Sequence, residues 1–386
     1  MSGDAVRAGS SATLPVSVTV VIPHYNHSHI LPRAVASVLA ERMAGVEIII
    51  VDDGSTEDCE GVLAALEAAD PCVRVIRCQK NQGAPAALNV GLAEARGEFV
   101  NFLGADDLLI PGFLRTMADA LREHPDAALA CGDIVIVSTD SRVLGVRPFT
   151  APAWRAEYLS PAMVRRRIMG TDNWICNTAT LHRTETIRAH GGFDSALGSF
   201  CDGILCRLLV FGHGFVYVPG ISGIWQVAAN TLSASSVLNS EKLEHLLDLA
   251  RQKLAGSIVG ATAPEYVELY ERRLRMSAVR MRLLWKGKAA SASDIVQVAK
   301  GDALDSSVVG WIDRTIGLNR VGGTLVMSWF ALRRRPFNPL TLLLHAVRNR
   351  MMLRKNEAVV GRQLHELNAA GVALSQRVAA VDAPVH

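Results

Sequence analysis

The stretch E-F-V-N-F-L-G-A-D-D-L-L-I-P, from Glu98 to Pro111, decides the fold that the sequence predicts. Its apolar residues between 99 and 103 suffice for one buried strand and are too few for most helices. Two adjacent carboxylates, Asp106 and Asp107, follow, and Pro111 is placed to begin a helix. Ligands bind at the carboxyl ends of strands in open α/β sheets. Two carboxylates there favour a bound cation, and a solvated turn is the alternative for the pair taken by itself.

The chain before this stretch alternates β-branched apolar runs with helical patterns. The expected strands are 16–22, 46–51 and 73–78, and the expected helices are about 28–42, 58–68 and 84–95. This order predicts a parallel sheet with right-handed crossovers, in which each strand delivers a polar loop to the same edge. Neither G-x-G-x-x-G after the first strand nor G-x-x-x-x-G-K-[ST] is present, which disfavours dinucleotide and P-loop sites.

Composition narrows the class of protein. The 386 residues favour two regions, 16–239 and 240–386, and a net charge of +3 argues against a nucleic-acid partner. Seven cysteines without a C-x-x-C pair indicate free thiols in a reducing compartment. Residues 1–15 lack the apolar core of a secretory signal and are expected to be a disordered tail. No apolar run is expected to be long enough for a membrane span, which needs about 18 residues.

The pattern weakens after the opening stretch. Short strands are expected at 127–130, 134–137, 176–181 and 216–218. Residues 147–167 hold three prolines and are expected to form a loop-rich insertion. Amphipathic helices are expected at 241–255 and 265–285.

Several segments together resemble the family 2 inverting glycosyltransferases of the GT-A fold. They are V-V-I-P-H-Y-N at 20–26, I-I-I-V-D-D-G-S-T at 48–56 and the continuous run from 81 to 107. The order, spacing and loop chemistry match over about 16–114. The segment G-G-F-D at 191–194 and the pair Cys201-Asp202 are similar to later family motifs, with cysteine where a glutamate is usual. The resemblance implies an α/β, mostly parallel sheet flanked by helices, with a C-terminal helical extension.

The resemblance also implies a nucleotide-sugar site. Pro23 would shape the first loop, Tyr25 would stack on the base, and Asp53 would accept a hydrogen bond from it. Lys80 would lie near the phosphates. The alternatives are a helix cap for Asp53 and a core aromatic for Tyr25.

The two acids of the opening stretch and one later acid would carry the chemistry. Asp107 would bind Mn²⁺ or Mg²⁺ directly, and Asp106 would lie near the ribose or the metal. Inversion needs a carboxylate that takes the acceptor's proton, and Asp202 is the candidate. A helix cap at Asp202, or Asp194 as the base, are the alternatives.

Two positions depart from the family pattern. Gly104 stands where a first aspartate is usual, and Ala228 stands where a histidine often binds the metal. Three interpretations follow: a metal held by Asp107, diphosphate and water; a metal-independent enzyme in which Lys80 or the run 165–167 neutralises the phosphate; or a non-catalytic scaffold. The first is favoured because four acids remain, namely Asp53, Asp106, Asp107 and Asp202.

The C-terminal part has an acid-free segment, 320–356, in which arginines alternate with apolar residues. Such a pattern is typical of binding to an anionic membrane surface. The alternative is a helix packed on the catalytic domain with a basic outer face. Residues 357–380 are expected to form one more amphipathic helix, with a role in homo-oligomer formation.

These observations predict an inverting, hexosyltransferase-type enzyme. It would move a sugar from a UDP- or dTDP-linked donor to a hydroxyl of a glycan or lipid-linked acceptor in cell-surface polysaccharide synthesis. The expected location is cytoplasmic and peripheral to the inner face of the cell membrane. A nucleotidyltransferase is disfavoured because residues 23–26 are not a glycine- and arginine-rich phosphate loop. A non-catalytic subunit or glycan-binding scaffold is the other alternative.

Overall fold

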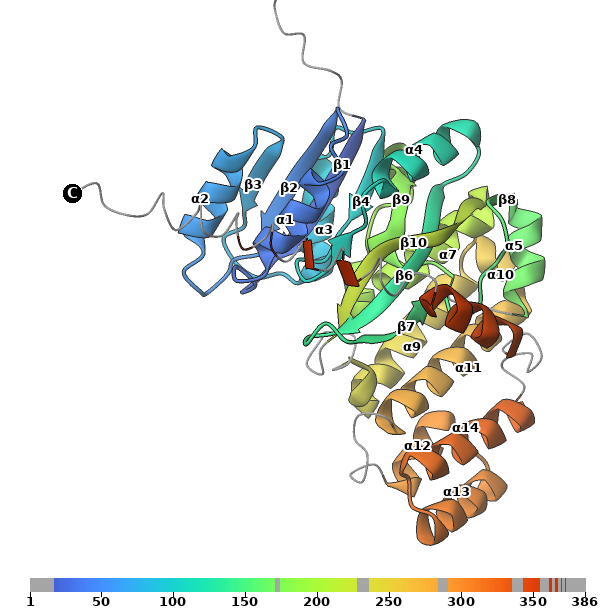
Figure 1. Cartoon of the computed structure of the whole chain (residues 1–386). Helices are drawn as coiled ribbons and strands as arrows, with labels where there is room; N and C mark the ends of the chain where they lie inside the picture. The colour runs from blue at the N-terminus through green and yellow to red at the C-terminus, as the bar shows by residue number, and fades with distance from the viewer. Residues whose placement is uncertain are drawn as a thin grey trace, which may run out of the picture.

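The computed structural model describes residues 17–170, 174–227, 236–283, 291–334 and 343–354, with isolated residues between 361 and 372. The predicted tail 1–15 and Ala228 lie outside the described residues. The first half of region 16–239 alternates strands and helices as expected (Figure 1). Its elements are β1 (Val18–His24), α1 (Leu31–Leu39), β2 (Val46–Asp52), α2 (Glu60–Ala69), β3 (Val73–Arg77), α3 (Ala84–Glu94), β4 (Phe99–Phe102), β5 (Leu108–Leu109) and α4 (Phe113–Glu123).

The second half is less regular. Its elements are β6 (Leu129–Ser138), β7 (Val143–Arg147), β8 (Glu157–Leu159), α5 (Pro161–Ile168), η1 (Asn177–Ala179), β9 (Thr180–Arg183), α6 (Thr184–Ala189), η2 (Ser195–Phe200), α7 (Cys201–His213) and β10 (Phe215–Val227).

All strands of the described chain join one mixed sheet of ten strands, in the order β3-β2-β1-β4-β9-β6-β10-β5, with β7 paired to β6 and β8 to β10. Strands β3, β2, β1 and β4 are mutually parallel, as predicted. Strand β9 runs antiparallel between β4 and β6, and β10 is parallel to β6. The sheet is therefore mostly parallel, and the loops that follow β1, β2, β3 and β4 meet at one edge.

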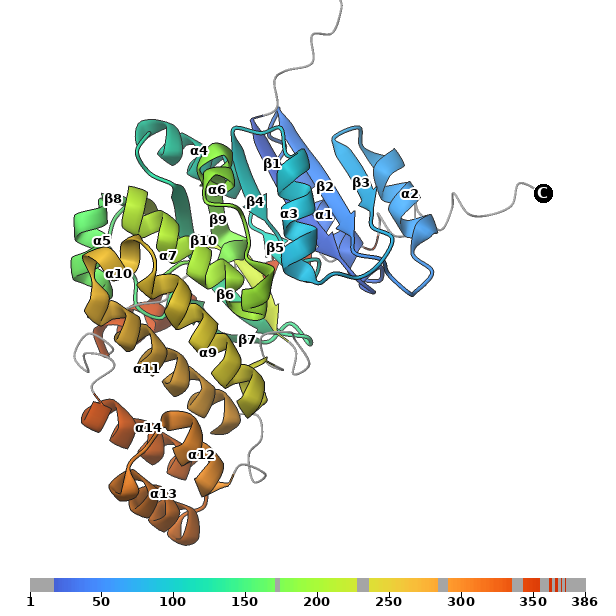
Figure 2. The same cartoon turned by 180° about the vertical axis from the view of Figure 1, so that it is seen from behind.

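Helices cover both faces of the sheet. Residues alternate along a strand, so Val18, Val20 and Ile22 pack with α1, α2 and α4 on one face. Val21 packs with α3 and α7 on the other face. Figure 1 shows α1 and α4 in front of the sheet, and Figure 2 shows α3, α6 and α7 in front of it.

Several local predictions need correction. Helix α4 begins at Phe113 rather than Pro111, because Gly112 takes a left-handed conformation and the Glu41 carboxylate accepts the Gly112 and Phe113 N–H groups. Strands 127–130 and 134–137 are one strand, β6. The polar residue within it, Asp133, is fully buried and accepts hydrogen bonds from Tyr217 Oη and the Gly220 N–H.

The other corrections concern strand ends. The strand expected at 176–181 is a short 3-10 helix, η1, followed by β9, and the strand expected at 216–218 extends over thirteen residues with two register shifts. The segment 147–167 is not only loop, since it contains β8 and most of α5.

The C-terminal region is helical, as expected, and appears in yellow to red in Figure 1. Its helices are α9 (Ser240–Ala255), α10 (Ile258–Thr262), α11 (Pro264–Met281), α12 (Ala292–Ala299), α13 (Ala303–Thr315) and α14 (Arg320–Arg334). One hydrophobic cluster runs from the sheet through α7 and α9 to α11 and α14. Val326 and Phe330 of α14 are fully buried, and Arg333 pairs with Asp302 and Asp305. Part of the acid-free segment is therefore used in packing within the chain.

By length and composition, the helical stretch Ser195–His213 is apolar enough to cross a membrane. More than half of it is buried within the fold, and Gly198 interrupts it with non-helical angles. We therefore interpret it as a core element, η2 followed by α7, that packs against α3 and α9.

Candidate active site

The acid pair lies between β4 and β5. Asp107 is 5% exposed; its Oδ2 accepts a hydrogen bond from Thr178 Oγ1 at 2.6 Å, and its Oδ1 accepts one from the Gln226 N–H at 3.1 Å. The 3-10 helix η1 and the end of strand β10 thus fix the orientation of this carboxylate. Asp106 beside it is partly exposed. Burial raises the pKa of both groups, and the neighbouring Asp106 raises the pKa of Asp107 further. The negative charge of the two carboxylates is therefore unfavourable here, and a bound divalent cation would neutralise it.

Gly104 lies against both carboxylates. A Cβ at this position would stand 2.9 Å from Asp106 Oδ1 and 3.1 Å from Asp107 Oδ2. The two acids occupy the space that a side chain at 104 would need. The glycine therefore changes the shape of the site as well as its number of ligands.

Asp202 lies in the first turn of α7, where the structure partly exposes it. Its Oδ1 accepts the Gly203 N–H at 2.7 Å, but the N-cap of α7 is Phe200 and no side chain caps this helix, so the capping alternative is wrong. Burial raises the pKa of its carboxyl group, against the opposing effects of the Gly203 hydrogen bond, Arg207 and Arg147. A raised pKa suits a general base, because the group then has a greater affinity for the proton it must remove.

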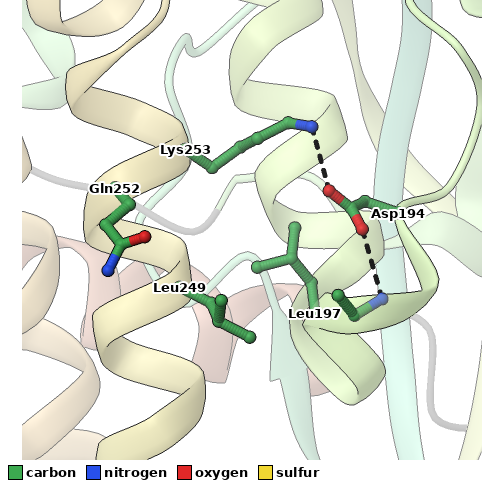
Figure 3. A pocket seen from close by; sticks show the side chains of 6 residues that line it. Asp194, Leu197, Leu249, Gln252 and Lys253 are labelled. Carbon is green, nitrogen blue, oxygen red and sulfur yellow. Dashed lines mark hydrogen bonds and ion pairs between the residues drawn. The ribbon is translucent and has the colours of Figure 1, made fainter.

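Asp194, the alternative candidate for the base, already binds other groups. Its carboxylate accepts the Ala196 N–H at 3.2 Å and pairs with Lys253 Nζ at 2.9 Å (Figure 3). The pocket drawn there lies in the seam between η2 and α9, and Asp194 is the only acid that lines it. We do not assign the chemistry to this seam.

Two residues that the sequence did not mark lie near the acids. Burial raises the pKa of the Cys176 thiol to about 12, and both Asp107 and Asp202 add to that shift, so the thiol lies near both carboxylates. Arg147, at the end of β7, opposes the shift and packs its guanidinium 5.4 Å from the centre of the Trp225 ring. Among the described residues Arg147 forms no ion pair. No motif marks either residue, because strand pairing far along the chain brings them here.

The loops that follow β1, β2 and β3 are joined to one another by side-chain hydrogen bonds. Asn26 Oδ1 accepts the N–H groups of Thr56 and Glu57, which joins the first loop to the second. The Asp53 carboxylate accepts the N–H groups of Gln82 at 2.9 Å and Gly83 at 2.8 Å, which joins the second loop to the third. The three loops therefore form one surface, as predicted.

The remaining predicted residues lie on this surface. Pro23 pairs with Val51 in the sheet, immediately before the first loop. Tyr25 is 39% exposed, so the core-aromatic alternative is wrong and its ring is free to stack on a ligand. Lys80 is exposed in the third loop. The cap alternative for Asp53 is also wrong for α2, since its carboxylate holds the third loop instead.

The arginine run 165–167 lies elsewhere. Arg167 pairs with Glu157 at 2.9 Å, and Glu157 lies opposite Tyr217 near the start of β10. Asp107 is bonded to Gln226, near the end of the same strand. The run is therefore too far away to neutralise a phosphate at Asp107, and that form of the metal-independent alternative is wrong.

His24, Asp52 and Cys59 form a second group of potential ligands, with their atoms within 4.8 Å of one another. His24 is buried, and neither ring nitrogen has a hydrogen-bond partner. Its Nε2 lies 4.0 Å from Asp52 Oδ1. Zinc ligands lie about 2.0–2.3 Å from the ion, so in a tetrahedral site the His24 nitrogen and the Asp52 oxygen would have to lie closer together than they do. Asp52 Oδ1 also already accepts hydrogen bonds from Ser55, and we assign no cation to the group.

Comparison with known proteins agrees with this geometry. Residues 19–181 match the sequence model of Glycosyl transferase family 2. An uncharacterized glycosyltransferase of Nostoc sp. is 39% identical over 28% of this chain and 33% of its own length. The succinoglycan biosynthesis protein ExoU of Rhizobium meliloti is 28% identical over 69% of this chain and 77% of its own. ExoO from the same organism is 33% identical over 39% and 43%. The chain thus spans less than half of the Nostoc protein and of ExoO.

Solved structures show the same fold at low identity. Staphylococcus aureus TarS 1-349 in complex with UDP-GlcNAc has a TM-score of 0.54 and 14% identity, covering 81% of this chain and 85% of its own. The mannosyltransferase PcManGT of Pyrobaculum calidifontis, in complex with GDP-Man and Mn²⁺, has a TM-score of 0.52 and 15% identity, covering 87% of each chain. The chain thus resembles glycosyltransferase family 2 over residues 19–181, and the solved structures show that it has the GT-A fold.

Proposed function

We propose that the chain is an inverting glycosyltransferase that uses a nucleoside-diphosphate sugar, UDP- or dTDP-linked, and a hydroxyl of a glycan or lipid-linked acceptor. The observation that carries the proposal is that two acids from separate elements, Asp107 and Asp202, both lie near Cys176. Direct displacement needs one group at the leaving diphosphate and another at the attacking hydroxyl. The relatives named for succinoglycan biosynthesis support an acceptor in surface polysaccharide synthesis.

The site fits a divalent cation such as Mn²⁺ or Mg²⁺. Asp107 would hold it and Asp106 would contribute, since both are carboxylates whose burial calls for a positive charge. When bound, the cation neutralises charge that develops on the leaving diphosphate. Thr178 and the Gln226 N–H keep Asp107 in one orientation. Arg147, unpaired among the described residues, adds a positive charge near the same centre, where it would help to neutralise the leaving diphosphate.

Asp202 acts on the acceptor in this proposal. Its carboxylate takes the proton as the acceptor oxygen attacks the anomeric carbon, and the raised pKa of the group favours that transfer. Tyr25 stacks on the base of the donor, and the loops joined through Asn26 and Asp53 hold the nucleotide surface in place.

Calorimetry with UDP, dTDP and their sugars, with and without Mn²⁺, tests donor binding. We expect Mn²⁺-dependent binding that Asp107→Asn weakens at least about tenfold, the loss of one charged ligand contact. Asp202→Asn should bind the donor like wild type but lose donor turnover by about 10²–10⁴-fold. The matched control is Asp194→Asn, which removes an acid paired to Lys253 and should retain turnover.

Each alternative has its own result. Absence of binding to any of these nucleotides would refute the transferase proposal. Donor binding without turnover in wild type, over a panel of glycan acceptors and water, would favour the scaffold. Turnover that survives Asp202→Asn and fails in Asp194→Asn would move the base to Asp194.

A further inference from the structure

Helix 343–354 is held on the catalytic domain by its polar residues. Arg348 donates to both carboxylate oxygens of the fully buried Asp133, at 3.1 and 2.9 Å, and to Tyr217 Oη at 2.8 Å. Asn349 Nδ2 donates to the Phe149 carbonyl at 2.8 Å. His345 Nδ1 accepts the Ala151 N–H at 3.2 Å. The helix, drawn in red in Figure 1, thus lies against strand β6 and the segment after β7 through buried polar side chains.

The opposite side of the same helix is apolar and exposed. Leu343, Leu344, Val347 and Met351 are 62%, 53%, 52% and 66% exposed. Residues at these spacings share one side of an α-helix. A surface helix of a globular domain ordinarily buries such a stripe and exposes its polar residues. Helix 343–354 has the reverse arrangement, which needs a second, apolar medium to cover the exposed side.

The surroundings of this face are aromatic and basic. Trp154, 64% exposed, stacks on His345 with ring centres 5.4 Å apart, and Phe149 is 45% exposed. Arg350 and Arg354 are exposed on the same helix, and the sequence from 320 to 356 contains no acid. Tryptophan beside arginines and aliphatic side chains is the composition found at membrane interfaces. A protein partner of ordinary composition would not require the positive border, whereas an anionic lipid surface would attract it.

We propose that helix 343–354 docks the chain on an anionic lipid surface through Leu343, Leu344, Val347 and Met351, with Arg350 and Arg354 contacting lipid phosphates. This goes beyond the proposed transferase function and does not depend on it. Leu353, on the inward side, packs against the cluster that contains Leu108 and Ile110, directly after the acid pair. Docking through this helix would therefore bring the acid-pair edge of the sheet close to the membrane, where a lipid-linked acceptor would be.

Helix α14 offers a matched control. It too exposes apolar residues, since Val321, Leu325 and Leu332 are 62%, 42% and 67% exposed. However, its opposite side packs through Val326 and Phe330, which are apolar, and Arg333 is paired with two acids. Substitutions on α14 remove as much exposed apolar surface without touching helix 343–354.

The test is co-sedimentation of the full chain with vesicles of phosphatidylcholine alone or mixed with phosphatidylglycerol. We expect binding only to the mixed vesicles, weakened by salt. Val347→Ser/Met351→Ser should lower the partition coefficient at least about tenfold, because two apolar side chains no longer enter the lipid. Arg350→Gln/Arg354→Gln should lower it about fivefold per arginine. Val321→Ser/Leu325→Ser should bind vesicles like wild type.

Several results would overturn the proposal. They are no vesicle binding by wild type, equal binding to neutral vesicles, or a loss of binding in the α14 control equal to that in the Val347/Met351 variant. A wild-type dimer that Val347→Ser/Met351→Ser converts to a monomer would show that a second copy covers the face. Lower thermal stability of that variant would show that the chain itself covers it. Nucleotide binding, measured in parallel, is expected to be the same in all variants, so a failure of docking is distinguishable from a failure of the transferase proposal.

Discussion

Replacing Gly104 tests how the acid pair is built. The glycine has no unusual backbone angles, so a substitution acts through the added side chain alone. A Cβ there meets Asp106 Oδ1 at 2.9 Å and Asp107 Oδ2 at 3.1 Å. Asp107 is fixed by Thr178 and the Gln226 N–H, and therefore Asp106, which is partly exposed, must turn away. Gly104→Ala thus moves one carboxylate of the pair and leaves the other in place.

The size of the effect follows from this geometry. Turning Asp106 out of its rotamer costs about 0.5–1.5 kcal/mol, which corresponds to about 2- to 10-fold weaker Mn²⁺-dependent donor binding in Gly104→Ala. Gly104→Asp restores the usual acid but sets a third charge about 4 Å from the other two, worth about 4 kcal/mol of repulsion per pair at an effective dielectric constant of 20. Solvent screening and proton uptake reduce this, and we expect a loss of about 2–3 kcal/mol in the free energy of unfolding without a cation.

Urea unfolding in EDTA and in Mn²⁺, with calorimetry of donor binding, measures both quantities. The stability lost in Gly104→Asp should return largely on adding Mn²⁺, because a ligand that binds only the folded state stabilises it. Gly145 provides the control, since a Cβ there meets nothing within 4 Å. If Gly104→Asp in EDTA were as stable as wild type, or if Gly104→Ala bound donor normally, the two carboxylates would not converge on residue 104 as described.

Three further predictions concern single contacts. Thr178→Val removes the 2.6 Å hydrogen bond to Asp107 and should weaken Mn²⁺-dependent donor binding by about tenfold in calorimetry, against an unchanged affinity if that bond does not orient the ligand. Burial lowers the pKa of His182 to about 3, so the stability it contributes is complete above about pH 6.5 and is lost as the pH falls toward 3. His182→Gln should therefore reduce the slope of the unfolding free energy against pH by about 1.4 kcal/mol per pH unit in that window. An unchanged slope would contradict the buried neutral state. Arg348→Met leaves Asp133 with only the Tyr217 hydroxyl and the Gly220 N–H as donors. It should speed amide exchange in 343–354 and lower the free energy of unfolding in urea by up to about 3 kcal/mol. Unchanged exchange would mean that the ion pair does not hold the helix.

The elements from β1 to β4 could be predicted because short stretches of sequence determine them. Each strand there is a run of β-branched residues, each helix has its own period, and each loop carries its own polar residues. The errors at element ends came from distant contacts. Glu41, for example, accepts hydrogen bonds at the start of α4, so that helix begins two residues later than its proline suggested.

The candidate site was predictable only in part, for the same reason. Asp106, Asp107 and Asp202 follow patterns that a sequence displays. Cys176 and Arg147 do not, because the start of a 3-10 helix and the end of an antiparallel hairpin bring them near the acids. No spacing rule connects residues that meet through strand pairing of this kind.

The acid-free segment shows a different limit, since its composition suited two opposite interpretations. One part, α14, packs on the helical region in the way the non-membrane alternative held. In the other part, a buried Asp133 on β6 and Tyr217 on β10 hold Arg348, and the apolar side chains consequently face outward. An amphipathic pattern states that a helix has two faces, but the partner of each face depends on what the rest of the fold offers. Here a buried acid on the sheet selects the polar face, and so the membrane interpretation now rests on twelve residues with a defined orientation instead of a composition.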